Sequence, residues 1–135
     1  MTPEIGPEHA AAQLAASIAF ADAGAQASRI QLYDDLGGAG SLLAEIELTK
    51  PCATLASGVI TLHTADTGGT LVLLTGIPRS GRWLSGAGLL VVAGTVTDAD
   101  HDGFFKVAGG ATPAGDTSPT LYAGGLVVLG ALTLT

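Results

Sequence analysis

With 135 residues the chain is long enough to bury a substantial core, and we expect one domain over residues 1–135. Twelve acidic residues stand against five basic ones, a net charge of −7, which excludes a nonspecific nucleic-acid binder because phosphate contacts need Lys and Arg. Only 13% of the residues are charged, against about 25% in an ordinary soluble domain. Either neutral small residues cover the surface or a partner covers part of it, and we favour assembly with a partner.

Hydrophobic residues make up 47% of the chain but aromatic residues only 4%, so Val, Leu, Ile and Ala must build the core. Twenty glycines and six prolines, without a collagen period, indicate frequent turns. Short strands joined by Gly-rich turns are typical of all-β folds. We therefore predict an antiparallel β-sandwich or jelly roll that carries one N-terminal α-helix.

The helix is expected over residues 7–24, where alanines dominate and Gly24 supplies an end. Leu14 and Ile18 fall at helical spacing and form a narrow apolar stripe. That stripe is expected to pack on the sandwich or on a neighbouring subunit. The first residues lack the basic segment of a signal peptide, so none is expected.

Strands are expected to fill residues 29–135, because apolar residues alternate with polar ones between turn signals. Pro51 is expected to close the second strand, since proline cannot donate to a ladder. Residues 77–88 are expected to form a loop. The uncharged run 117–135 is interrupted by glycines and fits strands better than a membrane span of about 20 apolar residues. The expected strands are Arg29–Tyr33, Leu42–Thr49, Gly58–His63, Thr70–Thr75, Leu89–Val96, Phe104–Ala108 and Leu126–Leu134.

The stretch Gly88–Gly110 combines a dense apolar segment with the densest acidic cluster of the chain. Its Asp98-x-Asp100-x-Asp102-Gly sequence matches the first half of a calcium-binding loop. The twelfth position is Gly109 instead of the bidentate Glu, and the flanks are typical of strands. We interpret the stretch as the central hairpin with an exposed acidic turn and predict no metal, with a weak calcium site at the three aspartates as the alternative.

Catalytic patterns are not found in the sequence. The single cysteine, Cys52, is interpreted as a packed residue and not as a nucleophile. The three histidines have no metal-ligand spacing, and neither Ser80 nor Ser85 lies in a G-x-S-x-G elbow. The glycines at 37–40 precede a strand, which does not match a nucleotide-binding loop. We predict a protein that is not an enzyme and has no cofactor.

The loop Pro78–Trp83 brings a cation and an indole together, and Arg and Trp are enriched at interface hot spots. An alternative for Trp83 is packing over the end of the sandwich. The predicted interface residues are Leu14, Ile18, Arg79, Arg82 and Trp83.

A broad pattern runs through most of the chain: the helix ending Asp22-Ala23-Gly24-Ala25, then Arg29-Ile30-Gln31-Leu32-Tyr33-Asp34, Leu42-Leu43-Ala44-Glu45-Ile46-Glu47-Leu48, Gly94-Thr95, Gly103-Phe104-Phe105-Lys106-Val107 and Leu132-Thr133-Leu134-Thr135. This order resembles small tailed-phage and prophage virion structural proteins of the capsid cement or decoration type. The chain departs from them in its Gly-rich first turn without proline and in its acidic turn. The shared motifs are strand patterns, so no functional residue carries over.

The resemblance implies a non-enzymatic capsid cement or decoration protein with a sandwich or jelly-roll fold, made in the host cytoplasm and placed on the phage head. Its expected partners are the major capsid protein and further copies of itself, as a homodimer or homotrimer, with no nucleic acid and no membrane. The alternative is a tail, baseplate or fibre-associated protein that binds a host receptor or carbohydrate through exposed aromatic residues. Trp83, Tyr33 and Tyr122 are the aromatics expected to serve that alternative.

Overall fold

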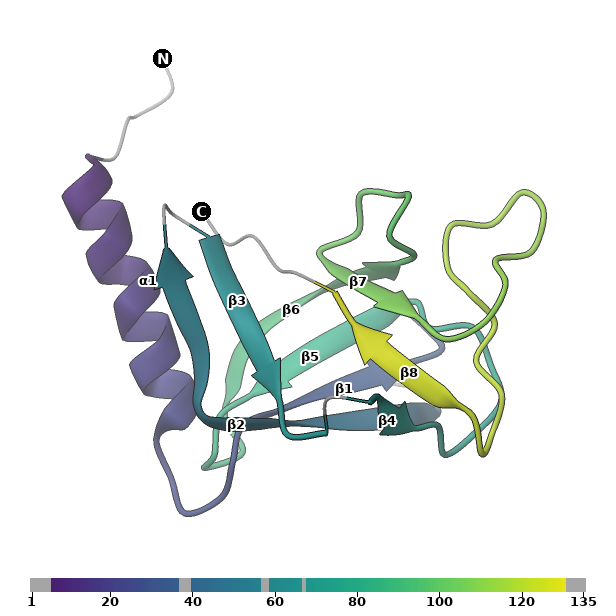
Figure 1. Ribbon diagram of the computed structural model, residues 1–135, viewed down its shortest axis with the longest axis horizontal. Coiled ribbons are helices and arrows are strands. Elements are labelled where there is room, and N and C mark those ends of the chain that lie inside the picture. Colours follow the sequence, from purple (N-terminus) through teal and green to yellow (C-terminus); the bar gives the residue numbers. More distant parts are fainter. Residues whose placement is uncertain (1–5, 37–39, 57–58, 67, 131–135) are drawn as a thin grey trace.

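A computed structural model describes residues 6–36, 40–56, 59–66 and 68–130. It is a mostly β protein with one N-terminal helix and a mixed, strongly curled sheet (Figure 1). Within the described residues the elements are α1 (Pro7–Asp22), β1 (Arg29–Tyr33), β2 (Leu42–Ala56), β3 (Val59–Thr64), β4 (Thr70–Leu71), β5 (Ser80–Leu84), β6 (Leu90–Thr97), β7 (Phe105–Ala108) and β8 (Leu126–Leu129).

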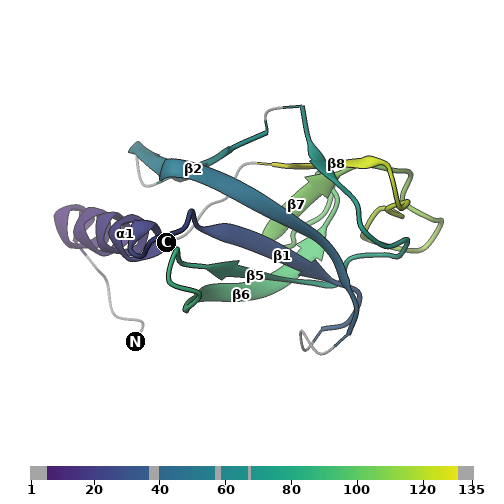
Figure 2. The same ribbon diagram turned by 90° about the horizontal axis from the view of Figure 1, so that it is seen from below.

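The sheet has the strand order β3-β2-β1-β5-β6-β7-β8-β4. Its pairs are antiparallel except β6 with β7, which run parallel. Just beyond β4, the N–H of Leu73 donates to the carbonyl oxygen of Leu43 in β2 at 2.7 Å. This bond joins the end of the strand order back to β2, so the sheet curls into a half-barrel, which is visible from below in Figure 2.

The prediction of a mostly β protein with an N-terminal helix is confirmed, but the sheet is not clearly a sandwich or jelly roll. A sandwich needs two sheets packed face to face. Here one hydrogen-bonded strand order continues around the core, and the half-barrel brings the segment after β4 beside β2. Alternating apolar residues predict a half-buried sheet equally well for either arrangement, so the sequence pattern did not separate them.

The core lies inside the curl. In β1 and β2 the inward side chains are Ile30, Leu32, Ala44 and Ile46, each at most 1% exposed. Their alternation with polar residues is the one that the sequence predicts. Trp83 and Phe105 are the largest fully buried side chains. Each such side chain stabilises the fold by about 1.5–3 kcal/mol or more relative to an exposed one.

Helix α1 packs mainly against β2 through the stripe that the sequence predicts. Leu14 and Ala21 are buried and Ile18 is half-buried, which matches the i, i+4, i+7 spacing of one helix face. The chain leaves the helix at Ala23, which is extended, and Gly24 follows with φ 109°. A Cβ at Gly24 would collide with the backbone of Ala87, so this close approach requires glycine.

Two strand predictions are wrong. Residues 77–88, expected to be a loop, contain β5, which lies at the centre of the sheet between β1 and β6. Its sequence, Ser-Gly-Arg-Trp-Leu, lacks the apolar alternation of a strand because one inward position is Gly81, which packs against the Phe105 ring. Strand β2 does not close at Pro51 but continues to Ala56. The ladder to β3 is irregular between Leu48 and Ala53, so the missing proline N–H falls where the regular pairing is interrupted.

The predicted central hairpin is also wrong. Strands β6 and β7 pair in parallel, with Val96 opposite Phe105 and Thr97 opposite Lys106. The chain therefore reverses twice between the two strands. Parallel strands usually need a dozen or more connecting residues, but residues 98–104 make this connection. The acidic turn is thus a compact loop that lets β7 run parallel to β6.

Two further strands are shorter than expected, since β4 ends at Leu71 and β8 at Leu129. The end of the expected last strand, residues 131–135, lies outside the described residues.

Candidate functional site

The acidic loop is organised around Asp98. Its carboxylate accepts hydrogen bonds from the backbone N–H of Asp100 at 3.0 Å and from the Thr112 hydroxyl at 2.6 Å, and it lies 2.6 Å from His101 Nδ1. The backbone N–H of Asp98 donates to the carbonyl oxygen of Thr117. Asp98 therefore ties its own loop to the segment that follows β7.

The other two aspartates of the predicted turn do not join Asp98. Asp100 and Asp102 are exposed. Among the described residues, no three His, Cys, Asp or Glu side chains gather as they would around a metal ion. The oxygen atoms of Asp98 are engaged by hydrogen bonds within the chain, which accounts for its position without a cation.

Asp98 and His101 shift each other's titration. The Thr112 hydroxyl and then His101 lower the pKa of Asp98, and the Asp98 carboxylate raises the pKa of His101. The 2.6 Å contact becomes an ion pair when His101 is protonated. The His101 side chain is 42% exposed and that of Asp98 is 16% exposed, so solvent screens the pair and its support for the loop is modest.

Arg79 forms a bidentate pair with Asp116, with contacts of 2.6 and 2.9 Å. The carboxylate also accepts from the backbone N–H groups of Thr117 and Ser118. The guanidinium holds the pKa of Asp116 well below its usual range, and Asp116 raises the pKa of Arg79. The Arg79 fork fastens the long loop after β7 to the residue that precedes β5. The Arg79 side chain is also 37% exposed, and its assignment to an interface stays a prediction.

The other predicted interface residues fall into two groups. Trp83 is 0% exposed and Leu14 is 5% exposed, so in this conformation their side chains are enclosed within their own chain and do not face a partner. Trp83 takes its alternative role as a packed residue. Ile18 and Arg82 are partly exposed, and for them the interface assignment stays a prediction.

Cys52 is buried, and burial raises the pKa of its thiol to about 11. At neutral pH the thiol is therefore protonated, which does not suit a nucleophile. Its backbone N–H donates to the Asp22 carboxylate at 3.0 Å. The predicted packed role of Cys52 is confirmed by this burial.

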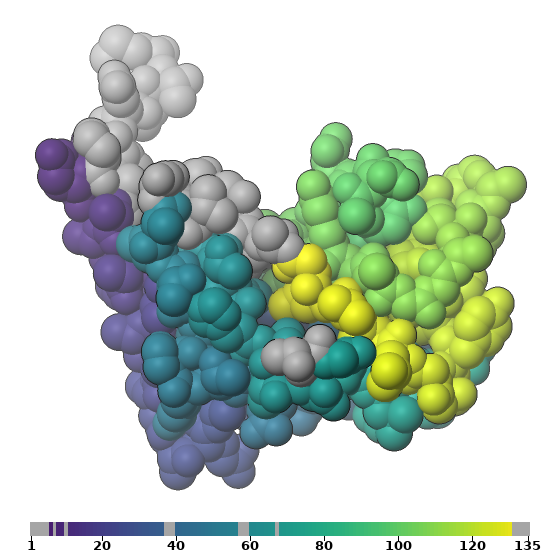
Figure 3. All heavy atoms as spheres, viewed as in Figure 1, coloured from purple at the N-terminus to yellow at the C-terminus, as the bar shows by residue number. Residues whose placement is uncertain are grey.

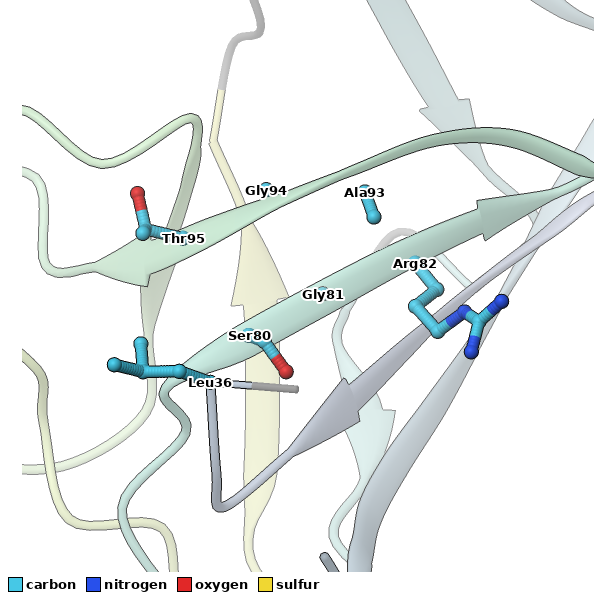
Figure 4. A pocket seen from close by; sticks show the side chains of 7 residues that line it. All are labelled: Leu36, Ser80, Gly81, Arg82, Ala93, Gly94 and Thr95. Carbon is cyan, nitrogen blue, oxygen red and sulfur yellow. The ribbon is translucent and has the colours of Figure 1, made fainter. Parts of the chain in front are cut away.

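A depression lies on the outer side of β5 and β6 (Figure 4). Arg82 and Ser80 extend from the same side of β5, with Leu36 at one end of the depression. Ala93, the register partner of Arg82, is small and leaves the space open. Both Ser80 Oγ and Arg82 Nε are buried and have no hydrogen-bond partner. Sequence reasoning singled out Arg82 but not Ser80, because β5 was not recognised as a strand.

A second feature is an apolar surface on β4, β8 and the segments next to them. Leu71 and Leu126 are cross-strand partners and are 55% and 52% exposed. The chain after β4 continues beside residues 121–125, held by mutual backbone bonds between Gly76 and Leu121. We call this the leucine surface; its exposed members are Leu71, Leu73, Leu74, Tyr122, Leu126 and Val128.

In the space-filling view, β8 in yellow lies beside teal residues of the β4 region on one face of the molecule (Figure 3). Sequence reasoning assigned strands here but did not find the surface. The available signal was that Leu126–Leu129 is apolar at every position, whereas a strand with one face in solvent normally alternates apolar and polar residues.

Comparison of the chain with protein-family models, with curated proteins and with solved structures found no match. In the described residues, the helix is not long and apolar enough to cross a membrane.

Proposed function

We propose that this chain is a non-enzymatic virion structural protein, a capsid cement or decoration protein that stabilises a phage head by bridging capsid subunits. The observation that carries the proposal is the leucine surface. Six large apolar side chains from two paired segments are each 46–60% exposed. Exposed large apolar side chains on neighbouring segments are typical of protein–protein contacts in soluble proteins.

The composition supports the same conclusion. With 13% charged residues, the chain has few charges with which to keep an apolar face soluble. A protein that functions within an assembly does not need charges on the face that its partner covers. A decoration protein acts by burying area across a joint between subunits, and that action requires complementary surfaces and no reacting groups.

The partners in this proposal are the major capsid protein and further copies of the chain in a homodimer or homotrimer. Closed symmetric oligomers are the usual form of such assemblies. The leucine surface is assigned to the capsid contact. The tail or fibre alternative receives less support, because Trp83 is buried and the Tyr33 hydroxyl donates to Gln31, which leaves Tyr122 as the largely exposed member of that aromatic set.

Copy number tests the proposal directly. Particles purified from cultures that produce the chain are analysed by quantitative mass spectrometry against the most abundant capsid subunit. Hundreds of copies per particle are expected for a decoration protein. A handful of copies would move the chain to the tail or baseplate, and its absence from particles would refute a virion role.

Rebinding to stripped particles tests the leucine surface. The double variant Leu71→Glu/Leu126→Glu places two charges on the surface and is expected to lose binding by at least tenfold, since a buried unpaired carboxylate is costly. The matched control is Leu89→Glu/Leu90→Glu, which adds the same charges at exposed leucines around the β5–β6 turn. Equal binding by both variants would remove the leucine surface from the contact.

A further inference from the structure

The depression between β5 and β6 contains hydrogen-bond donors that the chain itself does not use. Ser80 is 6% exposed and its hydroxyl has no partner. Arg82 Nε is buried and has no partner, and no ion pair of Arg82 is found among the described residues. A buried donor without a partner costs about 1–3 kcal/mol, so two in one place call for a physical explanation.

Neighbouring polar groups on the outer face are already paired with one another. Gln31, the register partner of Arg82, donates to Glu45 at 2.8 Å and accepts from the Tyr33 hydroxyl at 2.7 Å. Glu45 also lies 3.7 Å from Arg29 Nε. Gln31 and Glu45 are therefore engaged with other groups, and neither bonds to Arg82.

We propose that this depression is a binding site for a carboxylate, held by Arg82 and the Ser80 hydroxyl. Arginine has five N–H donors and no acceptor, and its fork matches the two oxygens of a carboxylate. Residues 80 and 82 are two apart on one strand, which places their Cα atoms roughly 6.5 Å apart on the same face. One carboxylate between them can accept from both side chains.

The walls favour a singly charged group with a short carbon chain. One guanidinium balances one negative charge, and the chain's net charge of −7 disfavours a dianion such as phosphate. Leu36 is 75% exposed at the end of the depression and offers apolar surface to the carbon chain of the ligand. The ligand is therefore a small organic acid or an acidic side chain of a protein, and this proposal is independent of the virion function.

The test is an amide NMR titration of the full chain with sodium acetate at constant ionic strength set by sodium chloride. A second titration uses a capped tripeptide, N-acetyl-Gly-Glu-Gly-amide, and acetamide serves as the neutral control. Saturable shifts are expected at the amides of residues 80–82 and 93–95 with either carboxylate and not with acetamide. Saturation by acetate alone assigns a free acid, and tighter binding of the tripeptide assigns a protein side chain.

Variants decide whether the named donors hold the ligand. Arg82→Gln is expected to weaken binding at least tenfold, and Ser80→Ala several-fold. Lys106→Gln makes the same charge change on β7, away from the depression, and is expected to bind as the parent chain does. Linear shifts without saturation, or equal binding by Arg82→Gln and Lys106→Gln, would overturn the proposal, and an unchanged spectrum elsewhere shows that each variant is folded.

Discussion

Two strand pairs of the same sheet, β1–β2 and β4–β8, differ in what they present to solvent. Both pairs turn apolar side chains inward: Leu32 and Ile46 are at most 1% exposed in the first pair, and Val127 is 1% exposed in the second. Outward, the first pair shows Gln31 and Glu45, joined by a hydrogen bond. The second pair shows leucines and a valine.

The outward residues of the two strand pairs differ in a way that folding alone does not require. Inward apolar residues are required by the core in both pairs, and outward polar residues are what solvent favours. The outward leucines of β4–β8 are only partly covered by the described part of their own chain. Leu71 and Leu126 are each about half exposed, although they stand directly opposite one another. Their exposure is the observation on which the proposed contact with a partner rests.

The largest expected effect comes from truncating an inward leucine of β1 and comparing it with an outward leucine of β8. Leu32→Ala removes a fully buried side chain from β1 and is expected to lower the free energy of unfolding by about 2–5 kcal/mol. Leu126→Ala removes a half-exposed side chain from β8 and is expected to change it by about 0.5 kcal/mol or less. Urea denaturation at low protein concentration measures both.

A loss above about 2 kcal/mol for Leu126→Ala would mean that β8 packs against this chain on both faces. The leucine surface would then be part of the core, and the contrast between the two strand pairs would not hold.

A smaller effect is expected at the connection between the two halves of the sheet. The loop from β6 to β7 carries the chain from the half that contains β1 and β2 to the half that contains β4 and β8. A Cβ at Gly103 would lie 2.7 Å from the Thr97 side chain, whose hydroxyl accepts from the Gly103 N–H. Gly103→Ala is therefore expected to cost about 1–3 kcal/mol of unfolding free energy.

Gly68→Ala is the matched control, since its Cβ would meet only an Asp66 oxygen at 3.7 Å. Thermal unfolding followed by circular dichroism compares the two variants. Equal melting temperatures would show that the loop tolerates a wider turn and does not fix the approach of β7 to β6.

The sequence predicted the parts of the fold that depend on local periodicity. Strand β1 and the helix stripe were predicted because polar and apolar residues repeat at the period of each element. Strand β5 was missed because its inward position next to Trp83 is a glycine that leaves room for Phe105, a partner distant in sequence. The parallel β6–β7 pair was missed because Asp-Gly turn chemistry predicts a hairpin, while the Asp98 bonds to Thr112 and Thr117 that fold the loop back come from the far side of β7.

The candidate site followed the same division. Arg82 could be singled out by residue type, but its position on the same face of β5 as Ser80 required the strand to be known. The Arg79–Asp116 pair could not be predicted, because nothing in the local sequence shows that Asp116, 37 residues away, accepts the Arg79 fork. The leucine surface was hidden because apolar residues in a strand look the same whether the core or a partner covers them.

The smallest expected effect concerns pH and the loop that joins the two halves. Asp98 raises the pKa of His101 above its ordinary value of 6.5, so the folded chain holds this proton more tightly than the unfolded chain. The stabilisation is complete below about pH 6.5 and is lost as the pH rises through the raised pKa of His101. Asp98 has a lowered pKa, so its own contribution is lost only as the pH falls through that lowered value, on the acidic side of 3.8.

Melting temperatures across about pH 5 to pH 9 are therefore expected to fall slightly on the alkaline side in the parent chain. His101→Gln is expected to remove that slope, because glutamine does not titrate. His63→Gln is the matched control, since His63 contacts the neutral hydroxyl of Thr54 instead of a carboxylate, and it is expected to keep the slope. An unchanged slope in His101→Gln would show that Asp98 and His101 form no ion pair in solution. The Thr112 hydroxyl and the backbone bonds alone would then hold the loop that connects the β1–β2 half of the sheet to the β4–β8 half.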